Sequence, residues 1–583
     1  MSAYPGNRFP GNYIIRQLRN AGVKKFFVSP GARSAPLVAA LSAEETVTHF
    51  DERGMSFAAL GHARATGKPT ACITTSGSAV ANLHPAAVEA FYSEIPLIFV
   101  TADRPARLLN RGANQTIDQQ NIFGPSQLAF LNLPITELQT SGETTEQQLL
   151  DTLGKPISKL VQTACGTPSG PVHLNCPFDE PLLPDDETCD LPDEAQVADF
   201  TALKTKSHIR MFFDVLLSSD SKTLFLIGQL TAKEQKYIPK ILELAVSQNW
   251  LLVPDVLSGL RQISHPNIFS YAHLWSKYAS EESLEELRPR RVLHLGESLV
   301  SKSLGKWLSK LGEQDYIHIS ASPRCRNPYQ KKIGKLQIPL KKFFSKFKNA
   351  WLPPSNDKKN TDWLQAFRRE TMRIEAVLKS NLSGSEAGNI RKLSEYLTGD
   401  INLFLGNSMP IRDFDMFATR GKKKSSLCFG NRGASGIDGN IATACGVSAA
   451  SGKTTLALLG DLTALHDLNS LALTTRPDVR GIFVVFNNRG GGIFRFLPLK
   501  IEEEKREALL ETPHPFEFSK AAEMFSLRYA LVENSEDFLK AFGTALGEKK
   551  LSAASWLIEI RSDRKENHSA HLKIAEMLRQ VLT

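Results

Sequence analysis

The stretch TTLALLGDLTALHDLNSLALTTRPDVRGIFVVFNN, residues 454–488, decides the fold of this chain. Its first six residues form an apolar run short enough for a buried strand, and residues 481–486 form a second such run. Residues 466–475 between them have the periodicity of a helix. Because two strands joined in this way lie parallel and side by side, the residues that follow them should meet at one edge of a sheet. Ligands bind at that edge in open α/β folds.

Polar residues follow both of these runs. Gly460 and Asp461 end the first, and Asn487 and Asn488 end the second, with Asn488 lying 27 positions beyond Asp461. A carboxylate, an amide oxygen and a carbonyl from the glycine run 490–492 are the hard oxygen ligands that Mg2+ favours, often beside phosphate oxygens. The pattern therefore predicts a metal-bridged diphosphate. Gly-Asp and Asn-Asn pairs are also common turn formers, and ordinary turn chemistry is the alternative interpretation.

Length and composition indicate a large globular enzyme. The 583 residues predict three domains, and the 42% hydrophobic content can build large cores. The net charge of +9 is spread over the whole chain without an aromatic-interleaved basic motif, so no nucleic acid is expected as a partner. No apolar run reaches the roughly 18–20 residues of a membrane span, and the start lacks the features of a secretion signal. Seven scattered cysteines without a Cys-x-x-Cys pair fit reduced thiols, so a cytoplasmic location is expected.

Strands and helices alternate along most of the chain. This alternation, with polar loops at the strand ends, predicts an α/β protein of three doubly wound domains with mostly parallel sheets. The expected domains are residues 1–182, 208–350 and 362–583. An acidic, proline-rich linker is expected at 183–207 and a polar boundary at 353–361. The first and third domains share one layout. The main expected strands are residues 24–28, 70–74, 96–101, 223–227, 251–254, 291–295, 316–319 and 402–405, and helices are expected at 13–20 and 57–66, with Ser34 capping another.

Five stretches of sequence carry a resemblance to a known family. They are SPGARS at 29–34, DERG at 51–54, TADRP at 101–105 with GANQ at 112–115, NRGASGIDG at 431–439 and GDLTALHDLN at 460–469. In joint order and spacing they resemble the thiamine-diphosphate-dependent decarboxylase superfamily, and more narrowly its branch in menaquinone biosynthesis. The resemblance covers essentially the whole chain and is weakest in the middle domain. It implies an N-terminal pyrimidine-binding domain, a central spacer and a C-terminal diphosphate-binding domain.

Thiamine diphosphate acts through its C2 carbanion, which adds to a 2-oxo acid and absorbs the electrons released with CO2. A carboxylic acid at the pyrimidine N1' promotes formation of that carbanion, and the resemblance gives this role to Glu52; the alternative is a surface glutamate in a charge cluster. The resemblance also makes Asp461, Asn488 and the Gly490 carbonyl ligands of Mg2+, which Mn2+ can replace. Ile437 is then the apolar residue beneath the cofactor. Further cofactor-binding residues implied in this way are Thr75, Ser76, Gly77, Ser408, Gly436, Leu462, Thr463, Ile493 and Phe494.

The substrates implied by the resemblance are 2-oxoglutarate and isochorismate. Each carries two carboxylates, which the planar fork of arginine holds in a bidentate manner. The succinyl unit left after loss of CO2 would add to the ring alkene of isochorismate. Two positions depart from the family pattern, since Ser303 and Ala32 stand where arginine and serine are usual. The matching substrate-binding positions are Arg33, Arg104, Asn114, Gln115, Lys302, Ser408, Arg412 and Arg432, of which Arg33, Gln115, Arg412 and Arg432 are expected to act in catalysis with Glu52.

Two other functions remain open from the sequence. The chain could be another thiamine-diphosphate-dependent decarboxylase or carboligase that accepts a different 2-oxo acid, and the arginine motifs argue against this. It could also be a non-catalytic relative that serves as a scaffold. Such a relative would be expected to lack Glu52 or Asp461, and both are present. The resemblance further implies a homodimer or homotetramer with active sites at subunit interfaces.

Overall fold

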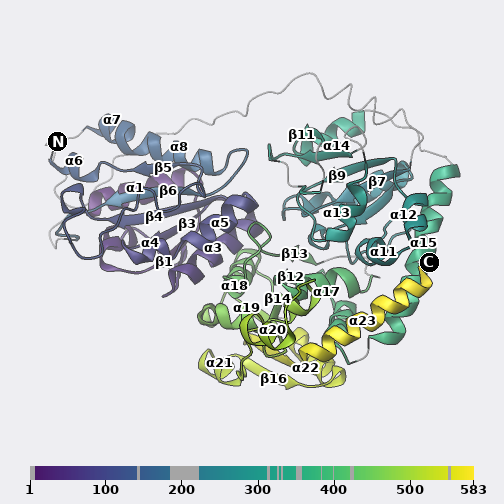
Figure 1. Cartoon of the computed structure of the whole chain (residues 1–583). Helices are drawn as coiled ribbons and strands as arrows, with labels where there is room; N and C mark the ends of the chain where they lie inside the picture. The colour runs from purple at the N-terminus through teal and green to yellow at the C-terminus, as the bar shows by residue number, and fades with distance from the viewer. Residues whose placement is uncertain are drawn as a thin grey trace. The chain divides into compact units, whose positions relative to one another are not determined.

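The computed structural model describes residues 7–140, 145–183, 222–311, 316–324, 327–329, 333–349, 358–382, 384–397, 399–420, 426–548 and 553–582. Within these residues three sheets are flanked by helices, and every strand pairing of the sheets is parallel (Figure 1). The predicted fold class is therefore confirmed, with parallel pairing throughout these sheets rather than mostly. The expected linker lies outside the described residues except for residue 183. The expected domain limits stay a prediction.

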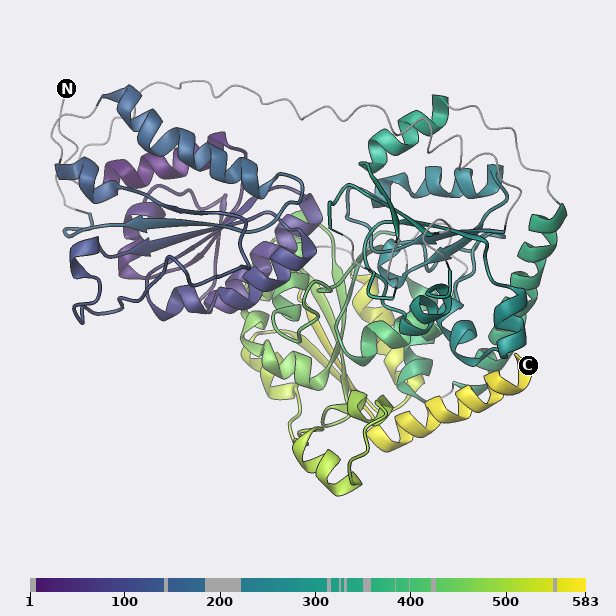
Figure 2. The same cartoon turned by 45° about the horizontal axis from the view of Figure 1, so that its top comes forward.

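The first sheet has the strand order β2-β1-β3-β4-β6-β5. Helices α1 and α8 pack on one face of it and α3 on the other (Figure 2). The strand order reverses between β1 and β3, so the loops after these two strands flank the point where open α/β sheets bind ligands. The strands are β1 (Phe26–Ser29), β2 (Thr46–Thr48), β3 (Thr70–Thr74), β4 (Leu97–Asp103), β5 (Phe130–Asn132) and β6 (Val172–Pro177); the helices are α1 (Arg8–Asn20), α2 (Ala35–Val38), α3 (Glu52–Thr66), α4 (Ser78–Ala81), α5 (His84–Ser93), α6 (Ile135–Thr140), α7 (Glu146–Leu149) and α8 (Lys155–Ala164).

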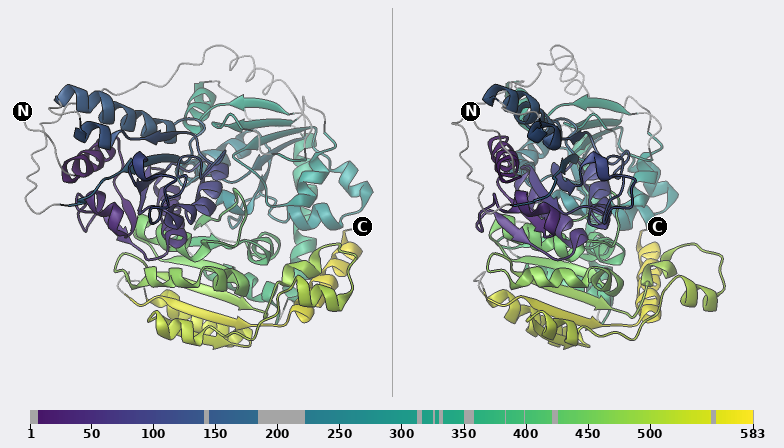
Figure 3. Two further views of the ribbon diagram at one scale, coloured as in Figure 1. Left: turned by 60° about the vertical axis from the view of Figure 1, so that its left-hand side comes forward. Right: turned by 90° about the vertical axis from the view of Figure 1, so that its left-hand side faces the viewer.

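The third sheet repeats this topology, with the order β13-β12-β14-β15-β17-β16. Helices lie along its strands in both views of Figure 3 (green to yellow). The predicted pairing of the two apolar runs is confirmed, because Gly460 at the end of β14 pairs with Phe486 on β15. The strand order reverses between β12 and β14. The strands are β12 (Asn402–Leu405), β13 (Leu427–Phe429), β14 (Thr455–Gly460), β15 (Gly481–Asn487), β16 (Arg528–Val532) and β17 (Trp556–Arg561); the helices are α15 (Lys358–Asn381), α16 (Glu386–Tyr396), α17 (Met409–Phe417), α18 (Asn440–Ser451), α19 (Asp461–His466), α20 (Glu503–Leu509), α21 (Ser519–Met524), α22 (Ser535–Gly547) and α23 (Arg564–Val581).

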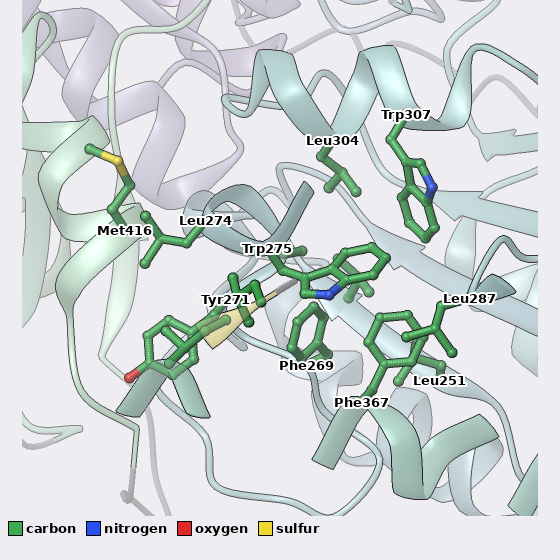
Figure 4. Packing of buried hydrophobic residues seen from close by; sticks show 14 of the residues in the cluster. Leu251, Phe269, Tyr271, Leu274, Trp275, Leu287, Leu304, Trp307, Phe367 and Met416 are labelled. Carbon is green, nitrogen blue, oxygen red and sulfur yellow. The ribbon is translucent and has the colours of Figure 1, made fainter. Parts of the chain in front are cut away.

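The second sheet, in the order β11-β10-β9-β7-β8, shares a hydrophobic core with helices α15, α17 and α23. Phe367 of α15 packs against Phe269 and Trp275, with ring centroids 4.8 and 5.1 Å apart (Figure 4). Removing one such buried aromatic side chain typically costs about 3–5 kcal/mol. The strands are β7 (Thr223–Ile227), β8 (Leu251–Pro254), β9 (Arg291–Leu295), β10 (Tyr316–Ser320) and β11 (Gly334–Gln337); the helices are α10 (Ile238–Ser247), α11 (Ala272–Tyr278), α12 (Glu281–Glu286), α13 (Lys302–Leu308) and α14 (Leu340–Asn349).

Two compact units result from this packing. One contains the first sheet together with residues 431–452 and 466–480, and the other contains the second and third sheets. In the first unit, α18 lies directly against α3, because glycines allow the two backbones to approach. A Cβ atom at Gly61 would lie 2.2 Å from the Thr443 carbonyl oxygen, and one at Gly446 would lie 2.0 Å from that of Ala58. Among the described residues, no helix is long and apolar enough to cross a membrane.

Several local predictions were wrong. The helix expected at 57–66 begins at Glu52, because Asp51 accepts hydrogen bonds from the backbone of Arg53 and Gly54 and caps it. The helix expected at 466–475 is divided into α19 and the 3-10 helix η7 (Leu468–Thr475). Ser34 does not cap α2, since its hydroxyl donates to the Gly31 carbonyl at 2.8 Å. Within the expected boundary at 353–361, the described residues 358–361 form the start of α15, and the boundary itself stays a prediction.

Candidate active site

The predicted residues fall into two groups. The first lies on loops at the carboxyl edge of the first sheet, near the place between β1 and β3 where the strand order reverses. Arg33 lies in the short 3-10 helix η1 (Ala32–Ser34) after β1, and Arg104 follows β4. Their exposed fractions are only 8% and 7%. Arg33 donates to the Phe178 carbonyl at 3.1 Å and pairs with Glu180 at 2.9 Å. Burial, and then the nearby charge of Arg33, lowers the pKa of Arg104.

Arg104 connects two loops of the predicted site. Its guanidinium donates to the Ser76 hydroxyl and, at 3.1 Å, to the backbone carbonyl of Gln115. Gly77 has a φ of +80°, and its N–H donates to the Gln119 side chain at 3.0 Å. Gln119, which the sequence did not single out, therefore supports this loop. The structure thus brings together Arg33, Arg104, Ser76, Gly77 and Gln115. Thr75, which precedes Ser76 in the chain, is buried. The side chains of Asn114 and Gln115 are exposed.

Glu52 opens helix α3 and is half-buried. The Asn82 side chain donates to its Oε2 atom at 3.1 Å. A helix N-terminus favours a carboxylate, because unpaired backbone N–H groups point outward there. Helix position and the Asn82 contact together hold Glu52 at the carboxyl edge of the sheet, the edge at which β1 and β3 end. Asn82 was not predicted from the sequence.

A buried glutamate fixes the loop that carries Arg432, Gly436 and Ile437. Glu89 is 2% exposed, and its two oxygens accept the backbone N–H groups of Gly433 at 2.9 Å and Ala434 at 2.7 Å. Arg64 balances its charge at 3.0 Å. Arg432, Gly436 and Ile437 are each half-buried. Glu89 lies 344 positions from Gly433, so the sequence alone gave no signal for this contact.

Asp467 lies in the same unit and has an altered pKa. Its carboxylate accepts the Ala442 N–H at 2.9 Å and the Ser470 hydroxyl at 2.6 Å. Burial raises its pKa to about 6, against the opposing effect of these hydrogen bonds. The folded-state pKa thus lies above the unfolded value. Between pH 4 and pH 6, roughly, the Asp467 carboxyl is ionised in the unfolded chain but still protonated in the folded protein. The free energy of unfolding therefore falls as the pH rises through this range to the folded pKa of about 6, and this loss is absent below about pH 4.

We expect the substitution Asp467→Asn to stabilise the protein more at pH 7.5 than at pH 5. An asparagine can accept the Ala442 N–H through its oxygen and donate from its NH2 group to the Ser470 hydroxyl, and it carries no charge to desolvate. The stabilisation is on the order of 3 kcal/mol at full ionisation and roughly half of that at pH 5, so the expected difference between the two pH values is about 1.5 kcal/mol. Thermal unfolding of parent and variant at both pH values measures it. An equal difference at the two pH values would show that the Asp467 carboxyl does not titrate in this range.

The second group of predicted residues lies at the carboxyl edge of the third sheet. Asp461 follows β14 and is 2% exposed. Its Oδ1 atom accepts the Leu462 N–H at 2.6 Å, and its Oδ2 atom accepts the Gly490 N–H at 2.8 Å. Gly490 has a φ of +151°, and a Cβ atom there would lie 2.5 Å from the Glu511 carbonyl oxygen. Only glycine therefore fits this position without a shift in the backbone.

Asn488 contributes an oxygen without a partner. Its Nδ2 atom donates to Glu386 at 3.1 Å, while its Oδ1 atom is buried and has no hydrogen-bond partner among the described residues. Burial raises the pKa of Glu386, although hydrogen bonds from Ser562 and Asn488 oppose this. A buried unpaired oxygen is costly, and a cation would satisfy it. The Gly490 carbonyl accepts the Gly492 N–H at 2.9 Å and keeps a second lone pair. Asp461, Asn488 and Gly490 therefore fit a divalent cation.

The remaining predicted residues of this unit lie on several elements. Ser408 follows β12 with a φ of +74°, and the Arg412 guanidinium donates to its carbonyl. Thr463 is buried, and Leu462, Ile493 and Phe494 are half-buried, the last two in the 3-10 helix η8 (Gly492–Phe496). Lys302 is exposed at the start of α13, beside the second sheet. Ser303 donates to the His273 carbonyl at 3.0 Å.

The fold and the two groups of residues match those of known cofactor-dependent enzymes. Three family models match: the N-terminal TPP binding domain of thiamine pyrophosphate enzymes over residues 10–122, their middle domain over 200–405 and their C-terminal TPP binding domain over 415–554. A solved structure, the thiamine diphosphate-dependent 4-hydroxybenzoylformate decarboxylase of Rhodococcus jostii RHA1, aligns with a TM-score of 0.70 and 16% identity. The alignment covers 95% of this chain and 99% of that one. These matches define a thiamine pyrophosphate enzyme.

Curated relatives narrow the class. Several are named 2-succinyl-5-enolpyruvyl-6-hydroxy-3-cyclohexene-1-carboxylate synthase. The one from Chlorobium phaeobacteroides is 36% identical over 98% of this chain and 97% of that protein. The one from Rubrobacter xylanophilus is 33% identical over 97% of this chain and 98% of that protein. A third, from Shewanella amazonensis, is 34% identical over 98% of this chain and 97% of that protein. The chain therefore belongs to the 2-succinyl-5-enolpyruvyl-6-hydroxy-3-cyclohexene-1-carboxylate synthase family. The resemblance seen in the sequence is confirmed.

Proposed function

We propose that this chain uses thiamine diphosphate and Mg2+ to decarboxylate 2-oxoglutarate and to add the succinyl unit to isochorismate in menaquinone biosynthesis. The observation that carries the choice of substrate is the buried pair Arg33 and Arg104 at the ends of β1 and β4. Two fixed guanidinium groups favour an anionic, multiply carboxylated ligand. Arg33 already pairs with Glu180, whereas the Arg104 guanidinium donates to two neutral oxygens, so Arg104 in particular favours a second carboxylate on the ligand.

The residues of the site have separate tasks in this reaction. Bound thiamine diphosphate supplies the electron sink for loss of CO2. Glu52 would hold a proton at the pyrimidine N1' atom, and Ile437 would provide an apolar contact to the cofactor. Asp461, Asn488 and the Gly490 carbonyl would hold Mg2+, or Mn2+ in its place, which would neutralise the charge of the diphosphate. Gln115, Arg412 and Arg432 orient the substrates, with help from Asn114, Ser408 and Lys302.

Direct product analysis tests the proposed reaction. Purified protein is mixed with thiamine diphosphate, Mg2+, 2-oxoglutarate and isochorismate, and the adduct is sought by mass spectrometry while released CO2 is counted. We expect one CO2 for each adduct formed. Release of CO2 from pyruvate but not from 2-oxoglutarate would instead favour a different thiamine-diphosphate-dependent decarboxylase or carboligase.

Arg432→Ala should weaken the use of substrate more than the binding of cofactor. The backbone of this loop is held by Glu89 through Gly433 and Ala434, so removal of the Arg432 side chain leaves the loop in place. We expect KM for one of the two dicarboxylates to rise about 10-fold or more, in line with loss of a charge-assisted hydrogen bond. Steady-state kinetics with each substrate varied in turn measure this. Arg369→Ala, at an exposed position of α15, is the matched control. Unchanged KM values for both substrates would remove Arg432 from the substrate site.

The proposed assembly and location follow from the family. We propose a homodimer or homotetramer whose active sites use residues of two subunits, and a location in the cytoplasm. Within the described residues, Cys72, Cys176, Cys428 and Cys445 are buried and free, which suits a reducing compartment. Sedimentation analysis of the holoenzyme distinguishes the two assemblies, and a monomer that is fully active would contradict both.

A further inference from the structure

We infer that Glu386 and His514 are positioning residues that orient the two side-chain ligands of the divalent cation. Neither residue belongs to the motifs of the sequence, and each contacts one ligand: Glu386 contacts Asn488, and His514 contacts Asp461. The inference rests on the metal site of the proposed function. It adds that the geometry of this site is set by a buried layer of side chains behind the ligands.

Glu386 determines which way the Asn488 amide points. It is the first residue of α16, is almost fully buried, and accepts hydrogen bonds from Asn488 Nδ2 at 3.1 Å and from the Ser562 hydroxyl at 2.6 Å. An amide has an NH2 group on one side and an oxygen on the other. Because the Glu386 oxygen accepts from the NH2 group, Oδ1 is turned to the opposite side. That oxygen is buried and has no hydrogen-bond partner in the described part of the chain, which leaves it available to a cation.

His514 acts on the other ligand. Its Nδ1 atom accepts the backbone N–H of Phe516 at 3.2 Å, so the ring proton resides on Nε2. Nε2 lies 3.2 Å from Asp461 Oδ2, close enough for an electrostatic contact although not aligned as a hydrogen bond. The His514 ring also stacks on Phe516, with centroids 5.4 Å apart and planes 17° apart. These contacts restrict the ring, and through it the Asp461 carboxylate that also accepts the Gly490 N–H.

The two residues come from segments distant from their ligands. Glu386 lies 102 positions before Asn488, and His514 lies on the segment between α20 and α21. Both are buried among the residues of the third sheet, so their contacts form when that domain folds and not when cofactor arrives. Loss of such outer contacts typically weakens metal binding by 10- to 100-fold.

Mn2+ titration of the full-length protein in the presence of thiamine diphosphate, followed by the electron paramagnetic resonance signal of free Mn2+, tests the inference. We expect Glu386→Ala and His514→Leu each to weaken Mn2+ binding about 10- to 100-fold. Glu386→Gln, which keeps an acceptor oxygen for Asn488, should recover most of the loss. Glu370→Gln on α15 and His273→Gln on α11 are matched controls within the same unit and should bind Mn2+ as the parent does.

A double-mutant cycle separates positioning from general damage to the fold. If Glu386 acts through Asn488, then Glu386→Ala has no further effect on Mn2+ affinity in an Asn488→Ala background. Equal losses in both backgrounds, or Mn2+ affinity unchanged in the single variants, would overturn the inference. Failure of the parent to bind Mn2+ would overturn the metal site as well. A parent that binds Mn2+ and yields no adduct would contradict the proposed reaction and leave the positioning roles intact.

Discussion

Glu52→Gln should lower turnover by roughly 100- to 10,000-fold while thiamine diphosphate still binds with nearly parental affinity. Glutamine has the shape of glutamate and can keep the contact with Asn82, but it cannot exchange a proton with the pyrimidine N1' atom. The expected range is that of a lost general acid or base. Turnover is measured as CO2 released from 2-oxoglutarate, and cofactor affinity by quenching of intrinsic fluorescence.

The control for this variant is Glu44→Gln, an exposed glutamate of the same domain. It should retain both turnover and cofactor affinity. If Glu52→Gln kept more than about a tenth of parental turnover, Glu52 would not be the proton-exchanging group. If it lost cofactor affinity and turnover in equal measure, its role would be binding.

Asp461→Ala should abolish retention of thiamine diphosphate that depends on a divalent cation. Asp461 is the one carboxylate among the three proposed ligands, so its removal leaves only neutral oxygens beside a diphosphate. It also removes the acceptor of the Gly490 N–H, which disturbs the third ligand. We expect cofactor affinity to fall at least about 100-fold, the upper range for a lost contact at a metal site.

Gel filtration of the Asp461→Ala holoenzyme with and without a chelator measures this retention. In the parent, the chelator should release the cofactor, and in the variant it should make no difference. Asp478→Ala, at a half-buried site on the other compact unit, is the control. Retention of cofactor by Asp461→Ala that still responds to the chelator would place the cation elsewhere.

The sequence predicted the sheets well, since their central strands are continuous apolar runs. Residues 223–227, 251–254, 291–295 and 402–405 form strands with the predicted bounds. The pairing of β14 with β15 followed from parallel connection rules. The start of α3 was not predicted, because the signal lies in one side chain, Asp51, whose hydrogen bonds turn an extended segment into a helix.

The supporting residues of the site could not be predicted from the sequence. Glu89, Gln119, Glu386 and His514 are ordinary polar residues in sequence, and each becomes informative only through a partner on a distant segment. Motif residues such as Arg33 and Asp461 stand at strand ends, where position alone indicates function. The buried residues that contact them have no such position in the sequence pattern. Their hydrogen bonds are important because the groups are removed from water, and this burial exists only in the folded protein.

The carboxylate of Glu89 has a consequence for how tightly a ligand can bind. By holding the N–H groups of Gly433 and Ala434, it keeps the loop from Asn431 to Gly439 in one conformation before any ligand arrives. The conformational entropy of this loop is thus lost during folding, where the cooperative free energy of the whole unit offsets it. A ligand that contacts Arg432 then meets a preorganised surface, and more of its interaction energy appears as affinity.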